Sequence, residues 1–154
     1  MSTKKTLVIM MGVQGSGKST FYARHLSGEY IRVNLDTLKT RNRERLLIEE
    51  CQTSSHSYAV DNTNPTRADR ERYIPTARAL GYRVIGYVMQ TGLEHCLERN
   101  RTREGKARVP DVAIYATLRK FEWPSYEEGF DELYLVENDG DEMVITPIPL
   151  QSVK

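Results

Sequence analysis

The sequence predicts an α/β fold in which a doubly wound, mainly parallel sheet of about five strands is flanked by helices. Two observations carry this expectation. An apolar run at 7–11 leads at once into a glycine-rich loop and then into a segment of helical periodicity. Further along, short apolar segments alternate with helix-like segments. Because strands that alternate with helices are joined by crossovers, they tend to form parallel sheets.

The first strand is expected at 7–11, where five consecutive apolar residues are too few to span a membrane but suit a strand buried on both faces. The next eight residues, GVQGSGKS at 12–19, match the P-loop pattern G-x-x-x-x-G-K-[ST] at every fixed position. Glycines let backbone amides approach phosphate oxygens, and the start of the following helix adds positive potential. The motif predicts the P-loop NTPase/kinase fold, although a glycine-rich turn with a solvated lysine is the simpler alternative.

In such a loop Lys18 would reach the β- and γ-phosphates of ATP or another NTP, and Ser19 would ligate Mg²⁺. The predicted nucleotide-binding residues of the loop are Gly12, Gln14, Gly15, Ser16, Gly17, Lys18, Ser19 and Thr20.

The remaining elements follow in order along the chain. Further strands are expected at 30–34, 57–60, 83–89 and 133–136, and helices at 43–51, from 64–66 to 81, from a capping box at 91–94, and at 112–121. Pro65 suits the first position of the second of these helices, Pro75 should kink it, and Gly81 should cap its end. A turn at 138–140 leads to 143–145, which could add an antiparallel edge strand.

Length and composition bound the protein without deciding its function. The 154 residues carry a net charge of +1 and fit one P-loop kinase domain, 1–154, with a core at about 6–137 and an extension at 138–154. The N-terminal residues support neither a signal peptide nor a membrane anchor, so a cytoplasmic location is the default. Cys51 and Cys96 lie far apart without metal-ligand spacing and are expected to be reduced, structural thiols.

Two acidic residues follow predicted strands, Asp36 after the second and Asp61 after the third. Ligands of such sheets bind beyond the carboxyl ends of the strands, so both acids are expected near the loop. Either could instead cap a helix or start a turn. Phosphoryl transfer, however, needs one acid to orient or deprotonate an acceptor hydroxyl and another near Mg²⁺ or its waters. Both are therefore candidate site residues.

A cluster of positive charge lies at 98–110, with five cations within ten residues. A solvated charged loop is the simpler interpretation. If the segment continues the preceding helix, Arg99 and Arg103 project from one face, and Gly105 permits a mobile lid. Such a lid would close over the donor phosphates and place guanidinium groups on the charge of the transition state.

Five segments carry a resemblance: GVQGSGKST at 12–20, VNLDTL at 33–38, DNTNP at 61–65, RNRTREGKARVP at 99–110 and KFEWPSYEEGF at 120–130. From about Leu7 to Val136 the sequence resembles the kinase domain of phage polynucleotide kinases and of animal polynucleotide kinase/phosphatase, and the small P-loop kinases more widely. The resemblance implies Lys18, Asp36 and Arg103 as catalytic residues. It makes Asp36 the general base on a 5′-hydroxyl, Asp61 the second acid and Arg103 the lid arginine. Lys39 would bind the acceptor's 3′-phosphate, where the phage enzyme has arginine.

Together these features predict an Mg²⁺-ATP-dependent kinase that phosphorylates the 5′-hydroxyl of DNA or RNA. The alternatives are a small-molecule kinase acting on a nucleoside or sugar, and a nucleotide-binding ATPase module without a hydroxyl acceptor. Lys39, Arg41, Arg43 and Arg45 are candidate nucleic-acid contacts, although a solvated helix face explains them equally well. The sequence contains no D-x-D-G-T phosphatase motif, so a separate 3′-phosphatase or ligase is an expected partner.

Overall fold

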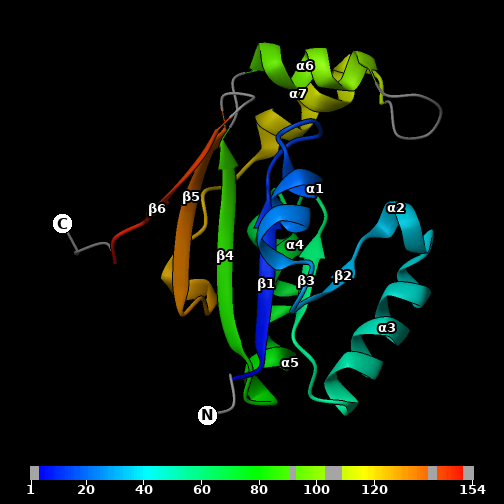
Figure 1. Ribbon diagram of the computed structural model, residues 1–154, viewed down its shortest axis with the longest axis vertical. Coiled ribbons are helices and arrows are strands. Elements are labelled where there is room, and N and C mark those ends of the chain that lie inside the picture. The colour runs from blue at the N-terminus through cyan, green and yellow to red at the C-terminus, as the bar shows by residue number, and fades with distance from the viewer. Residues whose placement is uncertain (1–3, 91–92, 103–108, 139–141, 151–154) are drawn as a thin grey trace.

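The computed structural model describes residues 4–90, 93–102, 109–138 and 142–150, and in it six strands form one sheet in the order β2-β3-β1-β4-β5-β6 (Figure 1). The strands are β1 Thr6–Met11, β2 Ile31–Val33, β3 Tyr58–Asp61, β4 Arg83–Gln90, β5 Glu132–Asn138 and β6 Met143–Pro147. The first five are parallel, and β6 pairs antiparallel with β5. The mainly parallel sheet and its antiparallel C-terminal edge strand are thus confirmed.

Helices cover both faces of the sheet and its carboxyl end. They are α1 Lys18–Phe21, the π-helical η1 Tyr22–Leu26, α2 Leu35–Leu38, α3 Arg41–Thr53, α4 Arg67–Glu71, α5 Ile74–Ala79, α6 Leu93–Thr102, α7 Asp111–Lys120 and the 3₁₀ turn η3 Tyr126–Glu128. Figure 1 shows α6 and α7 above the carboxyl ends of β1 and β4, on the side from which the P-loop emerges.

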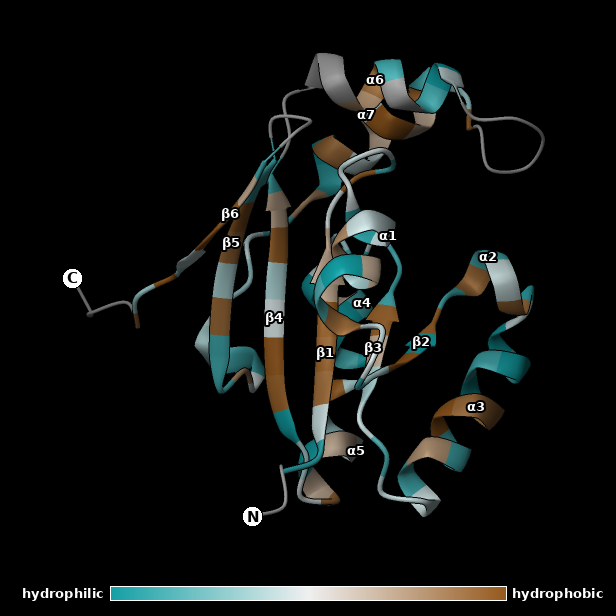
Figure 2. Cartoon of the chain, viewed as in Figure 1, coloured by the Kyte–Doolittle hydropathy of each residue, from teal (hydrophilic) through white to brown (hydrophobic). Residues whose placement is uncertain are grey.

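Strand β1 explains why a continuous apolar run is needed at the centre of the sheet. Its residues at 7, 9 and 11 belong to one core cluster, with α3 and α5. Its residues at 8 and 10 belong to a second cluster on the other face, with Phe21 and Leu26. Alternate side chains of a strand point to opposite faces, so a strand covered on both sides is apolar at every position. Figure 2 shows this hydrophobic character along β1 and β4.

The predicted helix from 64–66 to 81 is two helices, and the expectation for Pro65 was wrong. Thr66 is the N-cap of α4, in a capping box with Asp69, so Pro65 lies outside the helix. Pro75 lies in the first turn of α5 instead of kinking a continuous helix. Proline has no N–H to donate to residue 71, which favours a break before it. Gly81 follows the C-cap residue of α5 with φ +86, as expected of a helix end.

Other element boundaries shift by a few residues. The second strand is shorter than predicted, and α3 begins at Arg41 because the side chain of Thr40 accepts a hydrogen bond from the Arg43 N–H. The predicted capping box at 91–94 and the turn at 138–140 include residues outside the described ranges. Cys51 and Cys96 are both buried and form no disulfide among the described residues, as predicted. Within the ranges given above, no helix is long and apolar enough to cross a bilayer.

Candidate active site

The P-loop, residues 12–17, joins β1 to α1 at the carboxyl end of the sheet. The Gly12 N–H donates to the carbonyl oxygen of Thr63 at 3.0 Å, which ties the loop to the segment after β3. Gly15 has φ +82, and a Cβ there would lie 2.5 Å from the carbonyl oxygen of Cys96 on α6. Glycine at this position therefore serves both the turn and the close packing of α6 against the loop.

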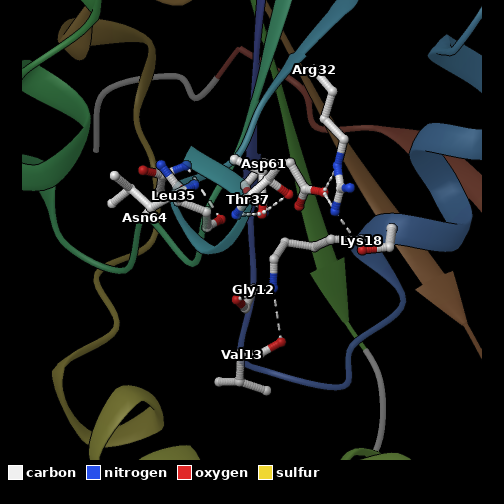
Figure 3. Close-up of polar contacts among 11 residues, drawn as sticks. Gly12, Val13, Lys18, Arg32, Leu35, Thr37, Asp61 and Asn64 are labelled. Carbon is white, nitrogen blue, oxygen red and sulfur yellow. Dashed lines mark hydrogen bonds and ion pairs between the residues drawn. The ribbon is translucent and has the colours of Figure 1, made fainter. Parts of the chain in front are cut away.

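The Lys18 ammonium donates to the carbonyl oxygens of Gly12, at 2.8 Å, and Val13, at 3.0 Å. Figure 3 shows the lysine side chain pointing into the loop toward these two residues. The Lys18 side chain is partly buried against the loop, and Ser19 and Thr20 are exposed beside it.

Asp61 ends β3 and is only 2% exposed. Its Oδ2 accepts hydrogen bonds from Arg32, from Nε at 2.8 Å and from a terminal guanidinium nitrogen at 2.7 Å. The same guanidinium nitrogen donates to Ser19 Oγ at 2.8 Å. The structure therefore brings the predicted Ser19 and Asp61 together, through an arginine on β2 that the sequence analysis missed.

Asp36 does not lie directly at a strand end. It is exposed in the first turn of the four-residue helix α2, and the N-cap of that helix is Asn34. Asn34 Oδ1 accepts from the Thr37 N–H at 3.1 Å, and its Nδ2 donates to the carbonyl oxygen of Asp61 at 2.6 Å. Asn34 therefore couples the helix that carries Asp36 to the end of β3, and the capping role considered for Asp36 belongs to Asn34.

A group of side chains around the buried Glu44, the Glu44 network, connects α2 to α3 and to the segment after β3. It comprises Glu44, Arg41, Asn62 and Tyr73. Glu44 is 3% exposed and accepts from Arg41 at 2.8 Å, Asn62 at 3.0 Å and Tyr73 at 3.0 Å. Asn62 Oδ1 in turn accepts from the Leu35 N–H at 3.0 Å. Burial, followed by the charge of Glu44, raises the pKa of Tyr73 to about 12, so this phenol is a neutral donor.

The segment after β3 is anchored from two further directions. Asn64 Nδ2 donates to the carbonyl oxygen of Met10 at 2.7 Å, and Arg70 donates to the carbonyl oxygen of Asn64 at 3.0 Å. Arg70 is fully buried and forms a bidentate pair with Glu128, at 2.8 and 3.1 Å. Glu128 belongs to KFEWPSYEEGF, one of the segments that carry the resemblance, and Arg70 on α4 joins it to DNTNP through the bond to Asn64.

Lys39 and the lid arginines complete the predicted set. Lys39 is exposed at the C-cap of α2 with φ +80, a backbone conformation that residues other than glycine rarely adopt. Such strain often occurs at binding sites. Arg103 and the side chain of Arg99 lie outside the described residues.

A cavity of about 580 Å³ lies between α3 and α5, away from the P-loop. Arg41 and Glu44 of the network line it, as do Arg45 and Arg72. Its lining contains none of the residues predicted to bind nucleotide or metal.

The donor set at Ser19 and Asp61 fits Mg²⁺. A hydroxyl and a carboxylate are hard oxygen ligands, and Mg²⁺ is usually held by one or two protein oxygens together with waters and substrate phosphates. In the part of the chain that the structure describes, no group of three or more His, Cys, Asp or Glu residues could hold a metal by itself. A metal at this position would depend on the nucleotide for its remaining ligands.

Comparison with known sequences gives the same picture. The family described as AAA domain matches residues 7–47 and 39–124. A protein of Acanthamoeba polyphaga mimivirus, assigned as a bifunctional polynucleotide phosphatase/kinase, is 31% identical over 140 residues, which are 86% of this chain and 33% of that protein. The bifunctional polynucleotide phosphatase/kinase of Schizosaccharomyces pombe is 29% identical over 133 residues, 84% of this chain and 33% of that protein. The chain thus spans about a third of these relatives.

Solved structures of low identity share the fold. A fungal RNA kinase superposes with a TM-score of 0.66 at 14% identity, covering 92% of this chain and 40% of that one. A sugar kinase from Janibacter sp. superposes with a TM-score of 0.62 at 17% identity, covering 86% and 85%. With the P-loop, the strand order and the family match in agreement, the chain belongs to the AAA domain family and has the fold of P-loop kinases.

Proposed function

We propose that this protein is a kinase that transfers the γ-phosphoryl group of ATP to the 5′-hydroxyl of a DNA or RNA end. One observation carries the proposal: the Asn34–Asp61 hydrogen bond joins the helix that carries a free carboxylate, Asp36, to the end of β3 beside the P-loop. A nucleotide-binding module needs no such second acid. The similarity to two proteins named polynucleotide phosphatase/kinase supports the choice of acceptor, and the chain would correspond to their kinase part.

The donor side of the site would be the P-loop with Lys18, Ser19 and Asp61. Backbone amides and the Lys18 ammonium would bind the β- and γ-phosphates. Mg²⁺ bound through Ser19, and through Asp61 or its waters, would neutralise charge on those phosphates. Arg99 and Arg103 would close over them from the lid.

The acceptor side would be α2 with Lys39. Asp36 would orient the attacking hydroxyl and accept its proton, because its carboxylate is exposed in the first turn of α2. Lys39, the C-cap residue of α2, would bind the phosphate on the 3′ side of the acceptor nucleotide.

The cavity between α3 and α5 supports a polynucleotide acceptor. Arg41 and Arg45 line it but are paired with Glu44 and Glu49 on the same helix. Arg72 also lines it and has no ion pair among the described residues. We propose that phosphates further along the strand approach this rim, which a nucleoside could not reach. The sugar kinase of the same fold keeps a small-molecule acceptor as the second candidate.

The test is a transfer assay with γ-labelled ATP against 5′-hydroxyl DNA and RNA oligonucleotides, a 3′-phosphorylated mononucleotide, nucleosides and sugars. We expect labelled oligonucleotides, with a KM that rises steeply with salt, since several phosphate contacts release counterions. Labelling of nucleosides or sugars alone would favour the second candidate, a small-molecule kinase. ATP hydrolysis that no acceptor accelerates would make it an ATPase module.

Lys39→Ala sharpens the assignment of the acceptor side. Loss of the ammonium should raise KM for the 3′-phosphorylated mononucleotide by about tenfold and for the matching nucleoside by less than about twofold, since a charged hydrogen bond to phosphate is worth about 1.5 kcal/mol. Lys4→Ala is the matched control, because Lys4 is an exposed lysine at the opposite, amino end of the sheet. Equal effects on both acceptors would remove the phosphate-binding role from Lys39.

A further inference from the structure

Arg32 has a position that neither the P-loop motif nor the acceptor residues explain. Its guanidinium joins two residues of the proposed metal site, Asp61 and Ser19, at 2.7 to 2.8 Å. Figure 3 shows the side chain reaching from β2 onto the Asp61 carboxylate. A positive group therefore lies on the same oxygen atoms that a divalent cation would use.

The strand register explains how the arginine reaches this place. Arg32 pairs with Ala59 of β3, and Ala59 pairs with Val8 of β1, so these three side chains share the face covered by α1. Asp61 pairs with Met10 and lies on the same face. Ser19 belongs to α1 itself. The arginine is thus the one charged residue of β2, placed toward the helix that begins at the P-loop.

The surroundings of the guanidinium hold it on these partners while leaving it a path to solvent. The Arg32 side chain is 33% exposed, whereas that of Asp61 is 2% exposed. The guanidinium lies 5.8 Å from the centre of the Tyr22 ring, a cation–π distance. A buried carboxylate needs a cation or hydrogen-bond donors, and Arg32 supplies both, while its partly exposed side chain has room to move toward solvent.

We propose that Arg32 is a built-in cation that competes with Mg²⁺ for Ser19 and Asp61, so that binding of the metal–nucleotide complex displaces it. Two positive groups cannot both occupy these oxygens, because their repulsion at contact distance is strong in a partly desolvated site. The inference rests on the proposed nucleotide site but not on the identity of the acceptor.

Competition of this kind has a measurable consequence for nucleotide affinity. Without metal, Arg32 neutralises Asp61, so the phosphates of ADP do not meet an unpaired buried carboxylate. With metal, part of the binding energy is used to move Arg32 away. Both effects reduce the factor by which Mg²⁺ tightens ADP binding, and removal of Arg32 should increase that factor.

The experiment is calorimetric titration of ADP in EDTA and in saturating Mg²⁺, with the ratio of the two Kd values as the readout. Arg32→Gln should raise the ratio by about three- to tenfold, the range expected for a partly exposed ion pair. Arg78→Gln is the matched control, since Arg78 also forms a partly exposed ion pair with an aspartate, Asp131, but lies on α5, outside the proposed site. Its ratio should equal that of the wild type.

Two further variants and the direction of the change decide the proposal. In an Asp61→Asn background, Arg32→Gln should leave the ratio unchanged, because the shared carboxylate is gone. Arg32→Lys keeps the charge without the planar fork and should raise the ratio by about twofold. This variant tests the proposal if Arg32→Gln does not fold. A ratio that substitution of Arg32 leaves unchanged or lowers would overturn the competition. If the ratio is unchanged because ADP binds more weakly by the same factor in both buffers, Arg32 is a direct phosphate ligand. Absence of transfer to any acceptor would refute the kinase proposal and leave this result standing.

Discussion

The two sides of the candidate site are built in different ways. On the proposed donor side, backbone groups join the P-loop to its neighbours, through the Gly12 N–H on Thr63 and Gly15 beneath α6, and the Lys18 ammonium bonds two of its carbonyls. On the acceptor side, α2 is a single exposed turn, oriented by the side chains of Asn34 and the Glu44 network. A backbone cradle suits the phosphates that every nucleotide shares. A side-chain network suits an acceptor whose identity differs between kinases, because side chains can change without loss of the loop.

The largest effect is expected on the donor side, from Lys18→Ala. Loss of one preorganised donor to transition-state charge costs roughly 10²- to 10³-fold in kcat, and weaker ATP binding should bring the loss in kcat/KM to roughly 10³ to 10⁵. Steady-state transfer and ADP calorimetry measure the two parts. Because the lysine bonds two loop carbonyls, melting temperature is measured in parallel. Turnover near the wild-type rate would remove the nucleotide site from this loop.

Asp36→Asn tests the acceptor side at the reacting atom. The variant keeps the shape of the side chain but loses its charge and basicity, so transfer should fall by roughly 10² to 10⁴ with Mg²⁺-ATP affinity nearly unchanged. Because Asn34 caps α2, the free energy of unfolding should stay within about 0.5 kcal/mol of wild type. Glu50→Gln, an exposed acid on α3, is the control. Transfer within about threefold of wild type would leave the general base unassigned.

The same contrast explains what the sequence could predict. The P-loop and the central strand are local patterns, and both lie where expected. Arg32 and Asn34 could not be found this way, because their partners are 29 and 27 residues away and are set by the pairing of β2 with β3. The sequence of β2 offered one signal, an arginine between the apolar residues Ile31 and Val33. Only β3 separates this strand from β1, which leads into the P-loop. Pro65 was misplaced because the stronger local signal, the Thr66 capping box, starts the helix at Arg67, two residues later.

Glu44→Ala tests whether the network orients the acceptor side without touching substrate. It leaves Arg41, Asn62 and Tyr73 without their shared acceptor, so stability should fall by about 2 kcal/mol. Through Asn62 and the Leu35 N–H, α2 should lose its position, raising the acceptor KM by about tenfold. ADP affinity should be unchanged.

Glu49→Ala is the control for this variant, because Glu49 accepts from Arg45 on the same helix but is 55% exposed. It should cost less than about 0.5 kcal/mol and leave KM unchanged. A Glu44→Ala protein that is destabilised but binds acceptor normally would show that the network supports the fold alone.

The smallest effect, and the one that separates fold from function most finely, is expected from Tyr73→Phe. Burial, followed by the charge of Glu44, raises the pKa of Tyr73 to about 12, whereas an unfolded tyrosine ionises near 10. The stability that this group contributes is fully present below pH 10 and is lost between about pH 10 and 12, because only the unfolded chain gives up its proton there. Tyr58, whose pKa burial also raises to about 12, should behave alike and serves as the control. Each Phe variant should therefore lose less stability than the wild type between pH 10 and 12, by about 1.4 kcal/mol per pH unit.

At pH 7 only Tyr73→Phe should raise the acceptor KM, by about threefold, since its hydroxyl bonds Glu44 while that of Tyr58 bonds Gln52. Chemical denaturation across this pH range gives the slopes, and the transfer assay gives KM. Equal KM values for the two variants would mean that the acceptor side does not depend on the network's phenol.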